Sequence, residues 1–315
     1  LRPRNDAKNM STLYTHQSAN IRKTWLLMSF FFGVVIAIGW IFSQVYGSPG
    51  ILYIAVLFSI AMNVVSYWFS DKIALALHRA RPVEFRNDPE LHRILENLCI
   101  TAGLPIPKFY LIDDPSPNAF ATGRDAKHAA IAVTSGLLKI TDRSELEGIL
   151  AHELSHIGNR DMLVSTVAVV LVGFVSIASD IFMRSMWFGG ANRDDDNRGA
   201  GALVLIGIVL SILAPIFASL IHMAISRRRE FLADASGALL TRYPEGLASA
   251  LRKIAKHDRP LKTATNATAH LFFDSPFDAD RNPDQLKRKT PWIIKMFSTH
   301  PPIEERIKML EELKI

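Results

Sequence analysis

The sequence predicts an α+β fold in which a mostly helical domain with a small antiparallel sheet is attached to four transmembrane helices arranged as two hairpins. Three observations lead to this prediction. The 315 residues are 49% apolar, and much of that apolar content lies in a few long runs. Short extended stretches bounded by turn residues lie between the second and third runs. The segments around them carry the apolar spacing of helices.

The first two apolar runs predict a transmembrane hairpin. Residues 25–42 and residues 51–69 contain no charged side chain, and a Gly-Ser-Pro-Gly turn at 47–50 separates them. A secretory signal peptide is the alternative, but the second run and the lack of a small-residue cleavage site argue against it. We therefore expect a hairpin over residues 24–70, preceded by a cytoplasmic tail of residues 1–23.

A second pair of apolar runs, residues 162–182 and 200–226, predicts another hairpin over residues 162–226. A polar loop with three consecutive aspartates joins the two runs. Asp180 and Pro215 interrupt the runs, so buried helices of a soluble domain are the alternative here.

Charge and cysteine content restrict the classes of partner and site. Basic residues flank the apolar runs, with Arg22 and Lys23 before the first and three arginines after the fourth, and the turn of the first hairpin has no charge. The positive-inside rule then places both termini and the segment between the hairpins in the cytoplasm. The excess of six basic charges is modest and favours membrane flanks over nucleic acid. The single Cys99 excludes an intrachain disulfide and a cysteine-based metal cluster.

Two soluble pieces, residues 71–161 and 227–315, should return to the same membrane face and form one domain. The elements expected in the first piece are, in order, a helix over 88–102, a strand over 108–112 and an antiparallel pair of strands over 118–122 and 129–134. In the second piece, residues 256–290 are polar and contain prolines, which predicts a long surface segment.

A metal-binding motif lies in the helix that follows these strands. Asp142 takes the N-cap position and Glu145 follows three residues later, which is a capping box. The His-Glu-Leu-Ser-His segment of residues 152–156 falls inside that helix. Because His152 and His156 are one turn apart, both imidazoles share one helix face and can bind one Zn²⁺. A surface helix that carries this short motif by chance is the alternative.

Glu230 and Asp234 repeat the one-turn spacing directly after the fourth apolar run. An antiparallel hairpin over residues 162–226 brings its two ends together, so Glu230 can reach the metal as a third ligand and Asp234 can hydrogen-bond a ligand imidazole from behind. Three protein ligands plus water are typical of a catalytic zinc site. Glu153 would then be the general base that moves a proton from water to the leaving amine. A solvated acidic helix face is the alternative.

These residues resemble the HtpX-type membrane metallopeptidases, with the CAAX prenyl endopeptidases as more distant relatives. The resemblance covers nearly the whole chain and rests on four matches in order: Asn-Ala-Phe-Ala-Thr-Gly at 118–123, His-Glu-Leu-Ser-His at 152–156 followed by Asp161, Glu-Phe-Leu-Ala-Asp at 230–234, and Thr-His-Pro-Pro at 299–302 followed by Arg306. It implies a gluzincin-like catalytic domain with zinc ligands His152, His156 and Glu230, the base Glu153, and supporting residues Asp234 and Asp161.

The resemblance also assigns roles around the metal centre. It implies an edge strand that pairs with an extended substrate through main-chain hydrogen bonds, formed by Asn118, Ala119, Phe120 and Ala121. A plain structural strand is the alternative. His300 would stabilise the oxyanion with Arg306 orienting nearby groups, although His-Pro-Pro is also typical of a turn that begins a helix.

We therefore expect a multi-pass zinc endopeptidase of a bacterial cytoplasmic (inner) membrane whose catalytic domain faces the cytoplasm. The resemblance implies that it cleaves misfolded or damaged membrane proteins, as quality control, with the lipid bilayer and unfolded chains as partners. Two alternatives stay open. A CAAX-type processing endopeptidase needs more transmembrane helices than the four expected, and a non-catalytic adaptor or chaperone with a structural metal site would have no use for Glu153.

Overall fold

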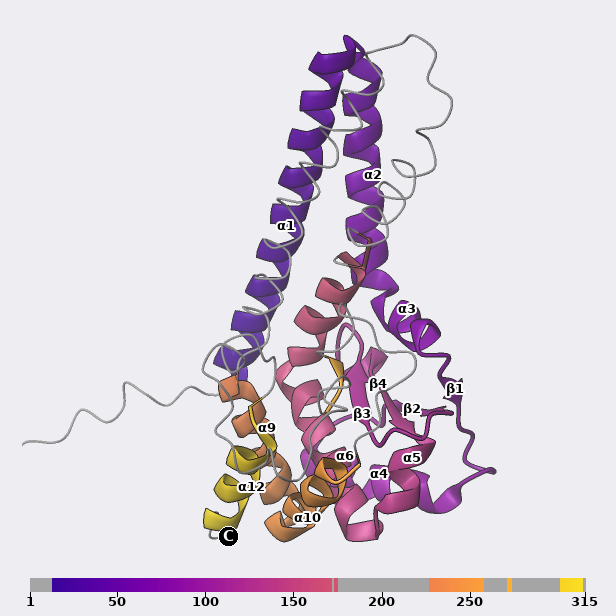
Figure 1. Ribbon diagram of the computed structural model, residues 1–315, viewed down its shortest axis with the longest axis vertical. Coiled ribbons are helices and arrows are strands. Elements are labelled where there is room, and N and C mark those ends of the chain that lie inside the picture. The colour runs from indigo at the N-terminus through magenta and orange to yellow at the C-terminus, as the bar shows by residue number, and fades with distance from the viewer. Residues whose placement is uncertain (1–12, 172, 175–226, 258–270, 274–300, 314–315) are drawn as a thin grey trace, which may run out of the picture.

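A long helical hairpin stands on a mixed α+β domain in the computed structural model of the chain (Figure 1). The structure describes residues 13–171, 173–174, 227–257, 271–273 and 301–313. Helix α1 (Leu13–Tyr46) and helix α2 (Pro49–Trp68) form the hairpin. Gly47, at a φ of 61°, makes the turn between them, a backbone conformation that glycine adopts without steric cost.

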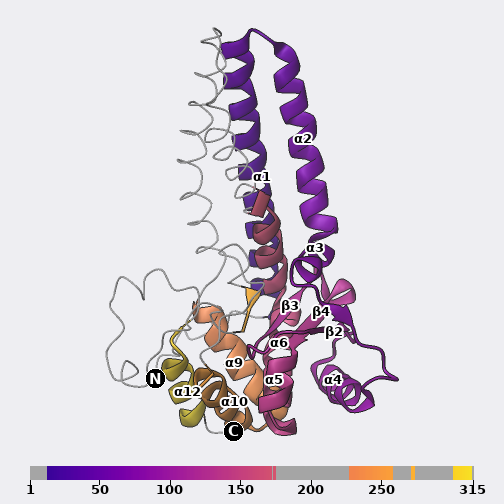
Figure 2. The ribbon, with the colours of Figure 1, turned by 45° about the vertical axis from the view of Figure 1, so that its right-hand side comes forward.

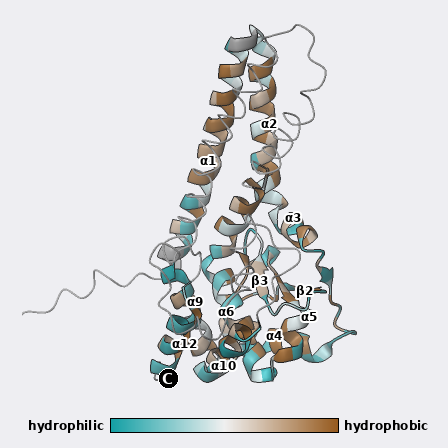
Figure 3. Ribbon diagram, viewed as in Figure 1, coloured by the Kyte–Doolittle hydropathy of each residue, from teal (hydrophilic) through white to brown (hydrophobic). Residues whose placement is uncertain are grey.

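Both helices of the hairpin are long and apolar enough to cross a membrane. The spans run over Gln17–Gln44 and Pro49–Trp68, and only 28% and 11% of their most apolar windows are buried. Figure 3 shows the apolar residues along the hairpin. The two helices approach closely at Gly39, where a Cβ would come within 2.2 Å of the Ala55 Cβ. The first predicted hairpin is therefore present as two such helices, and α1 begins at Leu13, inside the range predicted as a tail.

Three short elements lead from the hairpin into the domain: α3 (Ser70–Leu77), β1 (Arg81–Pro82) and α4 (Pro89–Ala102). The helix predicted over 88–102 is confirmed as α4. The Asp88 side chain accepts a hydrogen bond from the Leu91 backbone N–H at 3.1 Å, and Gly103, at a φ of 64°, ends the helix.

The sheet is mixed and not antiparallel throughout, so that part of the predicted fold class is wrong. Its strands are β2 (Lys108–Ile112), β3 (Ala119–Thr122) and β4 (Ala130–Thr134) in addition to β1, in the order β1-β2-β4-β3. The predicted antiparallel pair of β3 and β4 is confirmed, but β4 pairs with β2 in parallel. The reason is the path of the chain, because β3 forms the far edge and β4 then returns between β3 and β2.

Helices surround α6 (Arg143–Asn159), which carries the His-Glu-Leu-Ser-His segment. Helices α9 (Arg227–Thr241) and α10 (Pro244–Ala255) pack against it together with α4, whereas α12 (Ile303–Glu312) packs on α9 and α10, and α5 (Ser135–Ile140) on β4. In Figure 2, α9 and α10 lie on one side of α6 and α4 on the other. The predicted capping box is confirmed, with Asp142 accepting from the Glu145 N–H at 3.0 Å and Glu145 accepting from the Asp142 N–H at 2.8 Å.

The chain continues from α6 into a further apolar helix, Asp161–Leu171. Arg160 separates the two helices with a left-handed backbone (φ 56°). Leu163 and Val167 of the second helix pack against Phe31 of α1, so this helix continues along the hairpin. The second predicted hairpin covers residues 162–226, and residues 172 and 175–226 of it lie outside the described residues.

Candidate metal centre

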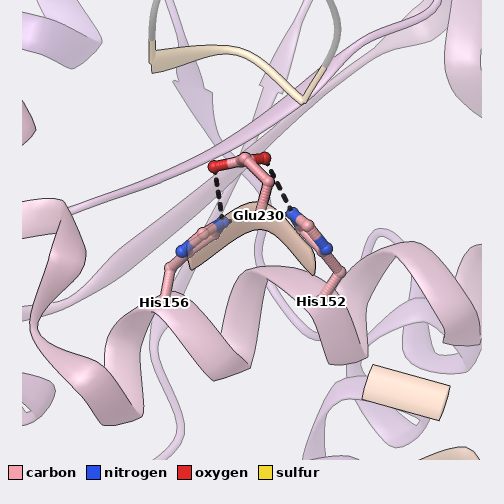
Figure 4. A group of neighbouring side chains, drawn as sticks. All are labelled: His152, His156 and Glu230. Carbon is pink, nitrogen blue, oxygen red and sulfur yellow. Dashed lines mark hydrogen bonds and ion pairs between the residues drawn. The ribbon is translucent and has the colours of Figure 1, made fainter. Parts of the chain in front are cut away.

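The two histidines of α6 and a glutamate of α9 converge in the interior of the domain (Figure 4). The Nε2 atoms of His152 and His156 are 3.1 Å apart. Glu230, in the first turn of α9, places Oε2 3.8 Å from His152 Nε2 and Oε1 3.6 Å from His156 Nε2. Glu230 lies 74 residues after His156 in the chain. Two segments that are distant in the sequence therefore present three donor groups to one point.

The donor set fits a metal ion. One ligand atom from each of the three residues lies within 4.8 Å of the other two. Two ligands about 2.0–2.1 Å from a tetrahedral zinc ion lie roughly 3.3 Å apart. The separations of 3.1, 3.6 and 3.8 Å among these side chains are close to that value. In the part of the chain that the structure describes, this is the group of histidine, cysteine and acidic side chains close enough together to hold an ion.

A carboxylate stands behind each imidazole. Asp234 Oδ1 lies 2.9 Å from His152 Nδ1, and Asp161 Oδ2 lies 3.2 Å from His156 Nδ1. A carboxylate at Nδ1 fixes the ring orientation and the tautomer, leaving the Nε2 lone pair for a metal. Both imidazoles are therefore held with their Nε2 atoms directed at Glu230.

Arg306 of α12 fixes Asp234 in turn. Its Nε and Nη2 donate to the two carboxylate oxygens of Asp234 at 2.8 and 2.7 Å, and its Nη1 donates to the Phe273 carbonyl at 3.0 Å. Arg306 is fully buried. Burial alone would raise the pKa of Asp234, but the Arg306 guanidinium outweighs it and holds that pKa below its ordinary value. Asp234 is thus a buried anion aimed at His152.

The ionisation of the two histidines differs because their surroundings differ. Burial lowers the pKa of His152 to about 4, so this imidazole is neutral as a metal ligand requires. Burial also disfavours the charge on His156, but its hydrogen bond to Asp161 and the nearby Glu230 raise its pKa to about 9. A cation bound among these residues must displace that proton.

Glu153 lies next to the donor set and touches the edge strand. Burial raises the pKa of its carboxyl to about 7, and the Ala121 N–H donates a hydrogen bond to it. A carboxyl with a pKa near neutrality suits proton transfer in both directions. Glu153 thus lies against the strand that the family resemblance predicts to pair with substrate.

The four residues predicted to bind substrate are Asn118, which precedes β3, and Ala119 to Ala121 within it, and all four are buried. The Asn118 N–H donates to Thr134 Oγ1 at 2.9 Å, and the Ala119 carbonyl accepts from the Phe273 N–H at 2.8 Å. The Phe120 ring turns to the other face of the sheet, where it stacks edge-on against Phe272. His300 lies outside the described residues.

Three residues in this region, Phe273, Asn20 and Arg229, are not predicted from the sequence as part of the site. Phe273 packs its ring 4.9 Å from that of His152 and connects β3 to Arg306. Asn20 of α1 and Arg229 of α9 both donate to Asp161 Oδ1, at 2.7 and 2.9 Å. Arg229 is adjacent to Glu230, which could have pointed to it, whereas Asn20 lies in a polar stretch without a motif.

A candidate metal centre with an acidic residue beside it, below a hairpin able to cross a membrane, is the arrangement expected of a membrane metalloprotease. The model of Peptidase family M48 matches residues 86–314, and the chain belongs to that family. It is similar to a protease HtpX homolog of Caldanaerobacter subterraneus subsp. tengcongensis, with 46% identity over 309 residues covering 96% of this chain and 99% of the relative. A protease HtpX homolog of Pyrococcus furiosus is 46% identical over 293 residues, covering 92% and 95%.

The fold is also similar to a solved structure, the crystal structure of S. mikatae Ste24p. The TM-score is 0.51 at 17% sequence identity, and the match covers 95% of this chain and 67% of that chain. This likeness concerns the fold alone, and the predicted resemblance to HtpX-type metallopeptidases is confirmed by the family and by the relatives.

Proposed function

We propose that the chain is a zinc-dependent endopeptidase that hydrolyses peptide bonds of misfolded or damaged membrane proteins at the cytoplasmic face of a bacterial inner membrane. The observation that carries the proposal is the convergence of His152, His156 and Glu230, with Glu153 at their side. A site built only to hold a metal has no need of a buried carboxyl next to its ligands.

His152, His156 and Glu230 would hold the zinc ion. Two imidazole nitrogens and one carboxylate oxygen are ligands that zinc prefers, and three protein ligands are typical of its catalytic sites. When bound, zinc supplies a Lewis acid that polarises a peptide carbonyl and lowers the pKa of water. Asp234 and Asp161 orient the two imidazoles at the distances given above.

Glu153 would take a proton from the attacking water and pass it to the leaving amine. Its pKa of about 7 allows it to hold that proton for part of the cycle near neutral pH. The Ala121 N–H orients its carboxylate. His300 as an oxyanion-stabilising residue, with Arg306 orienting its neighbours, rests on the family resemblance.

An extended substrate would add to the outer edge of β3. In the described sheet β3 is the terminal strand, so its second edge has no strand partner there. The Ala119 carbonyl accepts from Phe273 and the Ala121 N–H donates to Glu153, so the outward polar groups of β3 lead directly to the base. A substrate strand would take over the Ala119 carbonyl from Phe273 and pass alongside Glu153.

The hairpin and its charges support the proposal of membrane proteins as substrates and of the cytoplasmic side. Helices α1 and α2 place the domain at one end of a hairpin able to cross a membrane. Arg22 and Lys23 of α1 lie on the domain side of the apolar run, which by the positive-inside rule is the cytoplasm. Quality control as the physiological role is taken from the resemblance to HtpX-type metallopeptidases.

The test is cleavage of an unfolded protein. The full chain, purified in detergent with a chelator and then given zinc, should cleave casein, and Glu153→Ala should bind the same amount of zinc without cleaving. Activity that needs both zinc and Glu153 would support the proposal. One equivalent of bound zinc with no cleavage of any unfolded chain would contradict it and would favour a metal-binding membrane adaptor.

A further inference from the structure

The first membrane helix reaches the metal centre. Asn20, 2% exposed, lies near the domain end of α1. Its Nδ2 donates to the Asn159 carbonyl at 2.9 Å and to Asp161 Oδ1 at 2.7 Å. One turn earlier, Gln17 Nε2 donates to the Gly158 carbonyl at 2.6 Å. Helix α1 is thus hydrogen-bonded to the end of α6, directly behind the ligand His156.

Asp161 is the junction between these contacts and the imidazole. Its Oδ1 accepts from both Asn20 Nδ2 and Arg229 Nη1, and its Oδ2 lies 3.2 Å from His156 Nδ1. Arg229 Nη1 also donates to Asn20 Oδ1 at 3.2 Å. A carboxylate whose one oxygen is held by two donors cannot rotate freely, so its second oxygen stays on the imidazole.

We propose that Asn20 is a positioning residue for the metal centre, which couples the docking of the first membrane helix to the orientation of His156. The inference rests on the proposed function, since it concerns the affinity of the zinc site. Asn20 touches neither the donor atoms nor β3. Asn20 acts through Asp161, which hydrogen-bonds Asn20 with one oxygen and faces His156 with the other.

An asparagine amide fits this place because the position needs donors and an acceptor together. The Nδ2 group supplies two N–H bonds, one for Asp161 and one for the Asn159 carbonyl, and Oδ1 receives Arg229. An aspartate of the same shape only accepts, and it would place a second carboxylate against Asp161. Leucine, of similar size, offers neither donor nor acceptor.

A purely structural tie between α1 and the domain is the competing explanation, and Gln17 supplies its control. Gln17 also hydrogen-bonds α1 to the end of α6, but to Gly158, and no described contact connects it to Asp161. Gln17→Leu therefore removes a docking hydrogen bond of the same kind and leaves the carboxylate behind His156 in place. Only Asn20→Leu should alter the metal centre.

The experiment measures zinc affinity by competition with a chromophoric chelator, using the full chain in detergent. The variants are Asn20→Leu, Asn20→Asp and Gln17→Leu, each with and without Asp161→Asn. Loss of an outer partner of a ligand histidine typically costs about 10- to 100-fold in metal affinity, so we expect about a tenfold loss in Asn20→Leu and little change in Gln17→Leu. In the Asp161→Asn background, Asn20→Leu should cost nothing further, because its effect passes through that carboxylate.

Cobalt absorption in place of zinc supplies a second readout, because its visible bands report ligand geometry. The Asn20 variants should shift these bands and Gln17→Leu should not. Three results would overturn the inference. Zinc affinity could be unchanged in both Asn20 variants, or Gln17→Leu could lose as much zinc affinity as Asn20→Leu. The third is an effect of Asn20→Leu that is undiminished in the Asp161→Asn background. Failure of the proposed function has a different signature, which is read in the unaltered chain: that chain would then bind no zinc, or would bind it without cleaving casein.

Discussion

Replacing Arg306 with methionine should destabilise the domain strongly, because it leaves a buried carboxylate without its charged partner. Arg306 and Asp234 are both fully buried, and two hydrogen bonds of 2.8 and 2.7 Å join them. Removing one partner of such a buried pair costs about 3–5 kcal/mol. At roughly 2–4 °C of melting temperature per kcal/mol for a domain of about 150–250 residues, the midpoint should fall by on the order of 10 °C.

A second substitution separates the charge effect from lost packing. In Arg306→Met with Asp234→Asn, the orphaned negative charge is removed, so the double variant should melt above the single one. Arg252→Met is the matched control, since Arg252 pairs with Glu245 at 2.6 Å on the surface, where such a pair contributes about 0–1 kcal/mol. Thermal unfolding at a fixed scan rate measures all three. If Arg306→Met alone melts within about 2 °C of the unaltered chain, it has lost no more than about 1 kcal/mol, which would refute this reasoning.

Three further predictions concern acid stability, close packing and thiol reactivity. Burial lowers the pKa of His78 to about 4, so its contribution to stability is complete above about pH 6.5 and is lost as the pH falls toward 4, by up to roughly 3 kcal/mol. Between pH 7.5 and pH 5 the melting temperature of His78→Phe should therefore fall less steeply with pH than that of the unaltered chain. Equal slopes would exclude His78 as the cause. A Cβ at Gly237 would lie 3.0 Å from the His152 backbone nitrogen, so Gly237→Ala should push α9 away from α6, cost about 1–3 kcal/mol of folding stability and weaken metal binding. In Gly158→Ala the nearest neighbour of the added Cβ would lie at 3.8 Å, so this variant should be tolerated. Equal melting temperatures for these two alanine variants would contradict that account. Burial raises the pKa of the Cys99 thiol to about 11, so iodoacetamide should modify the folded chain about tenfold or more slowly than the unfolded chain, and equal rates would show that Cys99 is accessible.

Features written in a short stretch of sequence could be predicted. The capping box of Asp142 and Glu145, the apolar period of α4 and the antiparallel pair of β3 and β4 each depend on residues within about one element of one another. The one-turn spacing of His152 and His156 needs only a regular helix. These predictions agree with the structure because local geometry decides them.

Features that depend on packing between distant segments could not be predicted. The parallel pairing of β2 with β4 follows from β3 taking the far edge, and no residue pattern in the strands fixes that order. Residues 13–24 have no apolar run, yet they extend α1 because Asn20 and Gln17 find partners at the end of α6. A contact that joins Asn20 to Asp161 across the sequence leaves no local trace.

The metal content of four purified variants tests the central claim most directly. The unaltered chain and Glu153→Ala should each contain one zinc ion per chain by elemental analysis after dialysis against trace zinc. His152→Ala, His156→Ala and Glu230→Ala should each lose most of it, because each removes one of the three donors. Loss of zinc in Glu153→Ala, or full zinc in Glu230→Ala, would contradict the division of roles between ligands and base.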